Sequence, residues 1–249
     1  MSERAALVTG ASSGIGEHTA RRLAGDGWRV LLVARREDRL KALADELPDS
    51  AYLAVDLTDA DAPERVRARV EELWGRLDLL VNNAGTSRRA AFGDDNGGYQ
   101  NVRGVMDLNF DAVLRLTEAL LPMLRGSAPS SVVNVSSIAG RVGRARTGAY
   151  SASKFALAGW TECLRMEEKR HGVHVGLVLP GFVSTEGFPQ EELTRSVRTR
   201  WIVSTPDKVA DAIVRAGPGG KAEVAVPRPW GFVPRFRYAT PGLARRISG

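Results

Sequence analysis

A tyrosine and a lysine stand four positions apart in the stretch GAYSASKFALAGW, residues 148–160. On a helix, side chains at positions i and i+4 lie on the same face, so Tyr150 and Lys154 would lie close together. A lysine cation beside a phenol favours the phenolate and lowers the pKa of the tyrosine below its usual value of about 10. The pair therefore predicts a proton donor that works near neutral pH.

Glycines gather near the amino terminus, where an expected strand gives way to a helix. The stretch TGASSGIG places Gly10, Gly14 and Gly16 at this turn. Glycines there allow a tight turn and let the backbone approach a pyrophosphate, which binds at the positive end of the following helix. The spacing is G-x-x-x-G-x-G rather than the wider fingerprint G-x-G-x-x-G. Taken alone, the turn fits either a dinucleotide site or a purely structural turn.

The elements that must position these residues alternate regularly along the chain. Apolar runs predict strands at residues 5–10, 28–34, 51–56, 77–85, 130–137, 173–181 and 222–227. Helical periodicity predicts helices at residues 14–26, 37–47, 61–75, 102–124, 150–171 and 206–216. Such alternation indicates a parallel sheet covered on both faces. The expected fold class is α/β, a doubly wound parallel sheet of the Rossmann type, with ligands beyond the carboxyl ends of the strands.

The composition excludes several classes of partner. The 249 residues carry a net charge of +6 and a pI near 9.9. The excess is arginine, 30 against 5 lysines, and it is interleaved with acids along the whole chain without a nucleic-acid reading motif. No apolar run approaches the roughly 18 residues that span a bilayer, and the first residues do not resemble a signal peptide. We therefore expect no nucleic acid and a cytoplasmic location.

The few histidines and the single cysteine bear on metal binding. His18, His171 and His174 show no metal-ligand spacing, and Cys163 stands alone. No metal is expected. Cys163 is expected to be a small core residue of the helix that follows Lys154.

Five motifs, in order along the chain, resemble the short-chain dehydrogenase/reductase family. They are TGASSGIG, NNAG at residues 82–85, Asn109, NVSSIAG with Ser137, and YSASK. The resemblance covers residues 5 to about 215, and the thirteen positions from Ser137 to Tyr150 match the family's usual interval. It implies an oxidoreductase that moves a hydride between a nicotinamide cofactor and a carbonyl or secondary alcohol (CH-OH) substrate.

The resemblance implies roles for the residues around the tyrosine. Tyr150 would protonate a carbonyl oxygen during reduction and act as base in reverse. Lys154 would lower the pKa of Tyr150 and bind the nicotinamide ribose, while Ser137 would donate to the same carbonyl oxygen. Ser137 is preferred over Ser136 because the family pattern S-x-x-G places the serine three residues before the glycine, here Gly140.

Asn109, in the stretch DLNFDAVLRL, completes this catalytic set. It resembles the family's helix-bending asparagine, which holds a water in a proton relay. The alternative interpretation is a buried amide satisfied by its neighbours. With Asn109, Ser137, Tyr150 and Lys154 all present, the chain has the family's whole catalytic tetrad.

The end of the second expected strand, LLVARRE, bears on the choice of cofactor. Enzymes that use NAD usually place an acid there, whereas this chain has Ala34 followed by Arg35 and Arg36. A guanidinium can pair with a 2′-phosphate, so NADP (NADPH) is expected and NAD is disfavoured. Arg35 would be the main phosphate partner, helped by Ser12 and Arg36. Surface arginines at the start of a helix are the alternative.

The resemblance also implies a full set of cofactor contacts. They come from the glycine-rich turn, the ends of the second and third strands, the NNAG motif, the helix at residues 150–171 and the segment after the sixth strand. Asp56 and Leu57 would contact adenine. The set is Gly10, Ser12, Ser13, Gly14, Ile15, Gly16, Arg35, Arg36, Asp56, Leu57, Asn83, Ala84, Gly85, Tyr150, Lys154, Pro180, Gly181, Val183 and Thr185.

The end of the chain departs from the family pattern. We expect residues 1–226 to form the Rossmann-like dinucleotide-binding and catalytic domain and residues 227–249 to form a basic, aromatic tail. This tail could pack on the domain over the substrate cleft, on a partner or on an anionic membrane surface. Its four prolines argue against one continuous helix. A homodimer or homotetramer is expected.

The substrate is expected to be a small carbonyl compound or alcohol. Its pocket would be lined by residues 86–96, 140–148 and 186–204, where Arg141, Arg144 and Arg146 raise the hypothesis of an acidic or phosphate-bearing substrate. Three functions remain open. They are an NADP-dependent carbonyl reductase or alcohol dehydrogenase, a 3-oxoacyl-carrier-protein reductase whose basic surface attracts an acidic carrier, and a catalytically silent dinucleotide-binding redox sensor.

Overall fold

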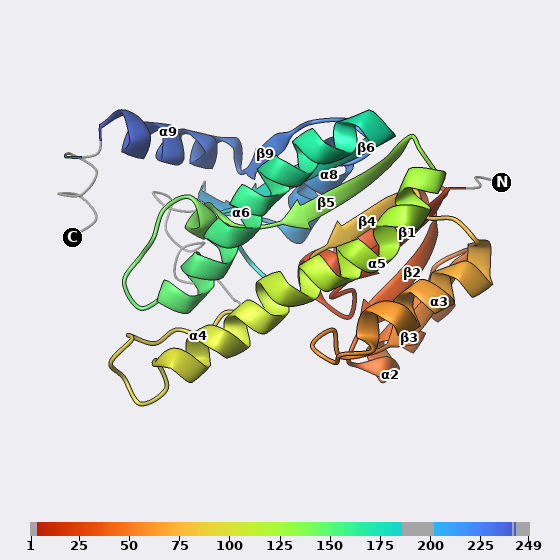
Figure 1. The fold of residues 1–249 in the computed structure, drawn as a ribbon, viewed down its shortest axis with the longest axis horizontal. Helices are drawn as coiled ribbons and strands as arrows, with labels where there is room; N and C mark the ends of the chain where they lie inside the picture. Colours follow the sequence, from red (N-terminus) through yellow and green to blue (C-terminus); the bar gives the residue numbers. More distant parts are fainter. Residues whose placement is uncertain (1–3, 186–201, 241, 243–249) are drawn as a thin grey trace.

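Seven parallel strands form the central sheet of the computed structural model, which describes residues 4–185, 202–240 and 242 (Figure 1). The strands are β1 (Ala5–Thr9), β2 (Arg29–Ala34), β3 (Ser50–Ala54), β4 (Leu79–Asn82), β5 (Ser130–Val135), β6 (Val173–Pro180) and β9 (Glu223–Val226). Their order in the sheet is β3-β2-β1-β4-β5-β6-β9, and every pairing is parallel. The strand order reverses between β1 and β4, where α/β sheets bind their ligands.

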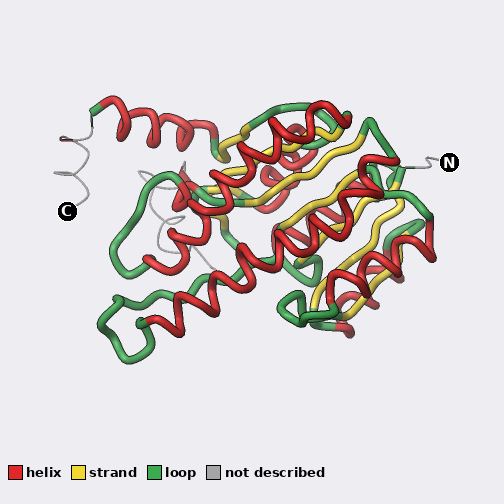
Figure 2. Tube along the Cα trace, viewed as in Figure 1, coloured by secondary structure: helices red, strands yellow, loops and turns green. Residues whose placement is uncertain are grey.

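Helices cover both faces of the sheet (Figure 2). One face carries α1 (Gly14–Gly25), α2 (Glu37–Glu46) and α8 (Pro206–Ala216). The other carries α3 (Ala62–Trp74), α5 (Ala112–Gly126) and α6 (Gly148–Glu168). The predicted doubly wound α/β fold is therefore confirmed.

Strand side chains alternate between two apolar cores, one on each side of the sheet. Leu79 and Val81 of β4 join the core under α1 and α8, together with Leu23. Leu80, between them, joins the opposite core with Leu120 of α5. Successive side chains of a strand point to opposite faces, so a strand that is covered on both sides must be apolar throughout. This is why the strands were visible as largely apolar runs.

The long helix predicted at residues 102–124 begins earlier and contains a distortion. Helix α4 (Tyr99–Met106) leads into a π-helical turn, η1 (Asp107–Asp111), and continues as α5. Asn109 lies in this turn. Single π-helical turns inside α-helices frequently occur at functional sites.

The structure contains several short elements that the sequence pattern did not predict. Strands β7 (Phe182–Val183) and β8 (Val203–Ser204) form a small parallel sheet. After β9, the short helix η5 (Arg228–Gly231) precedes α9 (Phe232–Ala239), so the tail does not form one continuous helix. The short helices η2 (Ile138–Gly140) and η3 (Lys169–His171) flank α6. None of the described helices is long and apolar enough to cross a membrane.

The prediction that Cys163 is a core residue is wrong. The buried side chains of α6 include Leu157, Thr161, Leu164 and Glu168, which recur three or four positions apart. Cys163 falls outside this stripe and is exposed. Within the described residues, no group of three or more His, Cys, Asp or Glu side chains could hold a metal ion.

Candidate active site

Two adjoining cavities lie at the carboxyl ends of the strands. The larger cavity has a volume of about 700 Å3 and the smaller cavity about 330 Å3. Both are lined by Ile15, Asn83, Gly85 and Thr185, so they form one continuous cleft. In Figure 1, the arrowheads of β4 and β5 mark the carboxyl ends of these two strands.

The glycine-rich turn forms one wall of the smaller cavity and requires glycine at three positions. Gly10 and Gly14 have φ angles of +67° and +55°, a backbone conformation that other residues rarely adopt. A Cβ atom on Gly16 would lie 2.2 Å from the carbonyl oxygen of Gly10. The first turn of α1 can therefore lie directly against the loop and present its N–H groups to a phosphate.

A hydrogen-bonded clamp joins this turn to the segment after β4. The hydroxyl of Thr9 accepts hydrogen bonds from the backbone N–H groups of Asn83 and Ala84 at 2.9 and 3.0 Å. The Asn83 amide donates to the carbonyl oxygen of Thr9 at 2.9 Å. Asn83 thus shapes the smaller cavity as well as lining it. Thr9 was not singled out as a site residue, although it directly precedes Gly10 in the first motif.

Two guanidinium groups lie at the far end of the smaller cavity. Arg36 donates to the hydroxyls of Ser12 and Ser13, at 3.1 and 2.7 Å. The Arg35 side chain is 72% accessible, and its Nη1 lies 3.7 Å from a carboxylate oxygen of Asp56. The structure therefore associates Ser12 with Arg36 rather than with Arg35. Both arginines line the cavity and could bind an anionic group there.

Tyr150 and Ser137 lie on the wall of the larger cavity. The Ser137 hydroxyl accepts a hydrogen bond from the Ala139 N–H at 3.1 Å and interacts with the side chain of Tyr150. The Ser136 hydroxyl instead donates to the carbonyl oxygen of Lys154 at 2.9 Å. This geometry favours Ser137 over Ser136 as the partner of Tyr150.

The glycine of the S-x-x-G pattern has a packing role. A Cβ atom on Gly140 would lie 2.5 Å from the carbonyl oxygen of Lys154. Glycine at this position lets η2 lie directly on α6. The spacing between serine and glycine therefore brings Ser137 against the helix that carries Tyr150.

The predicted effect of Lys154 on the tyrosine is wrong. Burial raises the pKa of Tyr150, and hydrogen bonding with Ser137 opposes this rise. The Lys154 ammonium lies 5.9 Å from the centroid of the tyrosine ring and donates to the carbonyl oxygen of Val135 at 2.9 Å. Its charge is thus directed at a main-chain carbonyl, while the low-dielectric surroundings penalise the phenolate.

The pKa of Lys154 is itself strongly shifted. Only 4% of the residue is exposed, and burial lowers the pKa of its ammonium from 10.5 to about 8. A folded-state pKa below the unfolded value means that the unfolded chain binds more protons between about pH 8 and 10.5, so stability rises with pH across that window. Below this window the buried charge costs on the order of 3 kcal/mol.

Replacing Lys154 by methionine should therefore stabilise the protein near pH 7. We expect the free energy of unfolding to rise by about 2 kcal/mol. Removing the buried charge stabilises the folded protein, and losing the hydrogen bond to Val135 offsets part of this gain. Urea unfolding at about pH 7 and about pH 9.5 measures this, with Lys169→Met on exposed η3 as the matched control. Equal effects of the two substitutions at both pH values would contradict the assignment.

Asn109 has a fully engaged amide. Its Oδ1 accepts a hydrogen bond from the Thr86 N–H at 2.8 Å, and its Nδ2 donates to the Thr86 carbonyl and the Ser153 hydroxyl at 2.9 and 3.0 Å. Asn109 thereby holds the segment after β4 against α6, which carries Tyr150. The side chain fits the alternative of a satisfied buried amide, and its part in a water relay stays a prediction.

A buried polar network behind the site was missed. Asn82 donates to Thr117 and Asn134 at 3.1 and 2.9 Å, and Asn134 donates to Thr161 at 2.9 Å. These bonds tie β4 and β5 to α5 and α6. Asparagines inside otherwise apolar strands were the available signal, because a buried amide requires partners.

Nearly all the predicted cofactor-binding residues come together in the cleft. Each lines one of the two cavities except Gly16, which packs beneath the glycine-rich turn. Asn109 is buried beside the cleft and does not line it. Of the predicted substrate-pocket segments, residues 186–201 lie outside the described residues.

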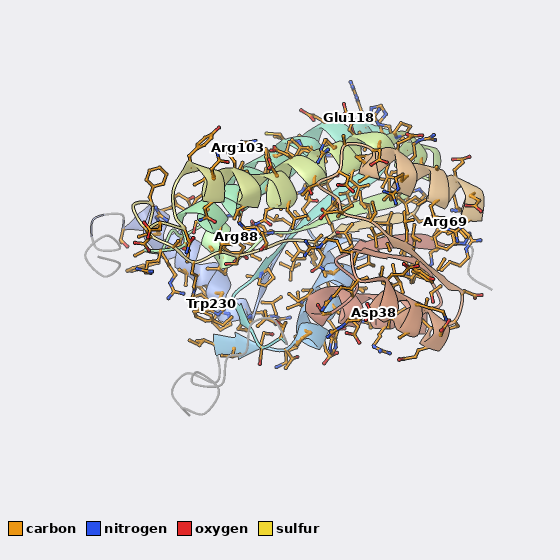
Figure 3. All side chains as sticks on the ribbon, turned by 90° about the horizontal axis from the view of Figure 1, so that it is seen from below. Asp38, Arg69, Arg88, Arg103, Glu118 and Trp230 are labelled. Atoms are coloured by element: carbon orange, nitrogen blue, oxygen red, sulfur yellow. The ribbon has the colours of Figure 1, made fainter. Side chains whose placement is uncertain are left out.

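The C-terminal tail contributes to the larger cavity through Trp230 and Val233. The Trp230 indole donates to the carbonyl oxygen of Ile202 at 3.0 Å and packs edge-on against Phe182, with 5.6 Å between ring centroids. A Cβ atom on Gly181 would lie 2.5 Å from the indole nitrogen. Figure 3 shows Trp230 far from Arg69 of α3, at the other end of the molecule. Trp230 and Val233 thus bring the described start of the tail to the cleft, while the position of the tail as a whole stays a prediction.

The three loop arginines differ in their surroundings. Arg141 forms salt bridges with one glutamate on α6 and another on β9, and Arg146 pairs with Asp94. Neither lines the larger cavity, so the hypothesis that they attract an acidic substrate is wrong for these two. Arg144 does line it.

The fold is that of a Rossmann-like α/β protein with a cleft at the carboxyl ends of its strands, and residues 4–195 match the family model described as short chain dehydrogenase. The chain belongs to the short-chain dehydrogenase/reductase family.

Particular relatives narrow the comparison. An oxidoreductase of Myxococcus xanthus strain DK1622 is 39% identical over 238 residues, 91% of this chain and 88% of the relative. A solved Pseudomonas aeruginosa RhlG complex with NADP is 30% identical with a TM-score of 0.79, covering 90% of this chain and 94% of that one. A crystal structure of actinorhodin polyketide ketoreductase with NADPH is 31% identical with a TM-score of 0.83, covering 92% and 97%.

Proposed function

We propose that the protein is an NADPH-dependent carbonyl reductase that converts a ketone to a secondary alcohol. The proposal rests on the position of Tyr150 and Ser137, which line the larger cavity. This cavity is continuous with the smaller cavity, which has the glycine-rich turn as one wall and Arg35 and Arg36 at its far end. The cleft fits a dinucleotide because glycines admit a phosphate at the start of α1 and guanidinium groups lie at its far end.

When bound, NADPH would supply the hydride that reaches the carbonyl carbon. The chain's own residues manage the proton and the developing charge. Tyr150 donates a proton to the carbonyl oxygen, and the raised pKa of its phenol keeps it protonated at neutral pH, which favours reduction. Ser137 donates a hydrogen bond to the same oxygen. Lys154 would bind the nicotinamide ribose.

The cofactor preference rests on the end of β2. Ala34 leaves no carboxylate there to repel a 2′-phosphate, and Arg35 and Arg36 line the cavity beyond it. Arg36 is already held by Ser12 and Ser13, so its guanidinium loses little freedom on binding an anion. The NADP and NADPH complexes of the two solved relatives support the same choice.

A second candidate is the reduction of 3-oxoacyl thioesters. The likeness to a polyketide ketoreductase favours it, as does the apolar wall that Phe182, Trp230 and Val233 give the larger cavity. Such a wall suits an acyl chain. The catalytic groups would act in the same way on either substrate.

Incubation of the purified protein with NADPH and a panel of ketones, aldehydes and acetoacetyl thioesters tests the proposal through the absorbance of the reduced nicotinamide. We expect turnover of ketones with NADPH and little with NADH. Turnover of thioesters alone would favour the second candidate. Tight NADPH binding without turnover of any carbonyl would contradict both and favour a redox sensor.

A further inference from the structure

We propose that the substrate carries an anionic group, a carboxylate or phosphate, at some distance from its reacting carbonyl, and that Arg144 binds this group. The inference rests on the proposed carbonyl reduction and names the class of substrate for that site. Arg144 lines the same cavity as Ser137 and Tyr150, so an anion bound by Arg144 would lie in the cavity that holds the reacting carbonyl.

The charges around the larger cavity favour an anion. Its described lining residues include Lys154, Arg89 and Arg144 but no aspartate or glutamate. Lys154 is buried and directed at the Val135 carbonyl. A cavity lined by one sign of charge raises the local concentration of ligands of the opposite sign.

Arg144 differs from its loop neighbours in having no acidic partner among the described residues. Arg141 and Arg146 are each neutralised by carboxylates, and neither lines the cavity. Among the residues that the structure describes, Arg144 forms no salt bridge and is exposed. Of these three loop arginines, the one that lines the cavity is thus the one whose charge no described carboxylate compensates.

Aromatic packing holds the Arg144 guanidinium in place. It lies 5.5 Å from the ring centroid of Phe182, whose ring in turn packs edge-on against Trp230. Stacking on an aromatic face leaves the N–H donors in the guanidinium plane available for a carboxylate or phosphate. The contact orders the side chain before a ligand arrives, which lowers the entropic cost of binding.

The main chain at Arg144 is tied to the helix that carries the tyrosine. The Arg144 carbonyl accepts hydrogen bonds from the N–H and the hydroxyl of Thr147, at 3.3 and 2.9 Å. Thr147 directly precedes α6, and Tyr150 lies in the first turn of that helix. The anion-binding group and the proton donor are therefore connected by a short, hydrogen-bonded segment.

The wall of the cavity suggests the rest of the substrate. Ile138, Val142, Phe182, Trp230 and Val233 provide an apolar surface in the same cavity. An oxo acid with a short aliphatic or aromatic body would place its ketone at Tyr150 and its carboxylate at Arg144. An oxoacyl thioester of a phosphate-bearing carrier group would place a phosphate there instead.

Matched pairs of substrates separate charge from shape. An oxo acid is compared with its methyl ester, and acetoacetyl-coenzyme A with the N-acetylcysteamine thioester, which lacks phosphates. We expect Arg144→Gln to lower kcat/KM for the anionic member about 30-fold more than for its neutral partner, mainly through KM. Arg144→Lys should restore part of the loss. Arg146→Gln, the matched control, should affect both members equally.

The pair that responds identifies the anion: the first pair indicates a carboxylate and the second a phosphate. Calorimetric binding of the same compounds to the NADP-loaded protein tests the anion site independently of turnover. If acids bind through Arg144 but no ketone is reduced, the proposed function fails while the anion site stands. If Arg144→Gln weakens binding of anionic and neutral members equally, the anion site is overturned.

Discussion

Replacing Tyr150 by phenylalanine is expected to lower kcat for ketone reduction by about 10³-fold and to leave the Kd for NADPH nearly unchanged. The substitution removes one oxygen and keeps the ring that packs beside Lys154. The proton for the carbonyl oxygen must then come from water. Steady-state kinetics with NADPH and the best ketone, together with titration of NADPH binding, measure both quantities. Tyr99→Phe, an exposed position on α4, is the matched control.

The pH dependence gives the same residue a second test. Burial raises the pKa of Tyr150, so the phenol is protonated throughout the neutral range. Reduction, which needs the protonated phenol, should be insensitive to this group near pH 7, whereas oxidation of the alcohol should rise with pH because it needs the phenolate.

A Tyr150→Phe enzyme that keeps a tenth or more of the wild-type kcat would show that Tyr150 is not the acid.

Arg35→Asp is expected to raise the Kd for NADPH about 100-fold while changing the Kd for NADH less than about 3-fold. The substitution removes a cation from the end of the smaller cavity and adds a carboxylate that repels the 2′-phosphate. Only NADPH carries that phosphate, so the effect should be selective. Fluorescence titration of the reduced nicotinamide measures both dissociation constants.

Two further variants sharpen the cofactor test. Lys41→Asp makes the same change of charge on α2, where Lys41 pairs with Asp45, and should leave both constants nearly unchanged. Arg36→Ala asks whether the guanidinium held by Ser12 and Ser13 shares the phosphate, in which case NADPH binding also weakens selectively. If Arg35→Asp weakens NADPH and NADH equally, the electrostatic argument for NADP is wrong.

Much of the fold could be predicted because its causes are local. A strand such as β4 is apolar on both sides, since Leu79 and Leu80 enter opposite cores. The glycine-rich turn could also be predicted from the sequence, because the close approach of Gly16 to the Gly10 carbonyl leaves no room for a side chain. Each of these features depends on a few neighbouring residues, and such features leave a pattern in the sequence.

The features that could not be predicted depend on contacts between distant segments. The spacing of Tyr150 and Lys154 says that they share a helix face, but not that the ammonium is directed at the carbonyl of Val135 on β5. Burial, rather than the charge of Lys154, therefore determines the direction in which the pKa of Tyr150 shifts. The position of Trp230 over the cleft likewise depends on contacts with Phe182 and Ile202, which are 48 and 28 residues away along the chain.

The candidate site shows the same division. The motifs identified the candidate site residues, and nearly all of these residues line the cleft. Which arginine is available was not predictable, because Arg141 is neutralised by acids from two separate elements, whereas no carboxylate in the described part of the chain pairs with Arg144. Charge compensation is a property of the folded surface. It is therefore read from the structure.

In the proposed reaction, a hydride reaches the carbonyl carbon of a ketone in the larger cavity while Tyr150 provides the proton. The most direct measurement uses NADPH carrying deuterium at the transferable position of the nicotinamide C4, with mass spectrometry of the alcohol. We predict that the wild-type product contains one deuterium on the carbinol carbon and that Tyr150→Phe forms almost none of it. An alcohol without deuterium, or no alcohol from any ketone despite bound NADPH, would rule out this reaction.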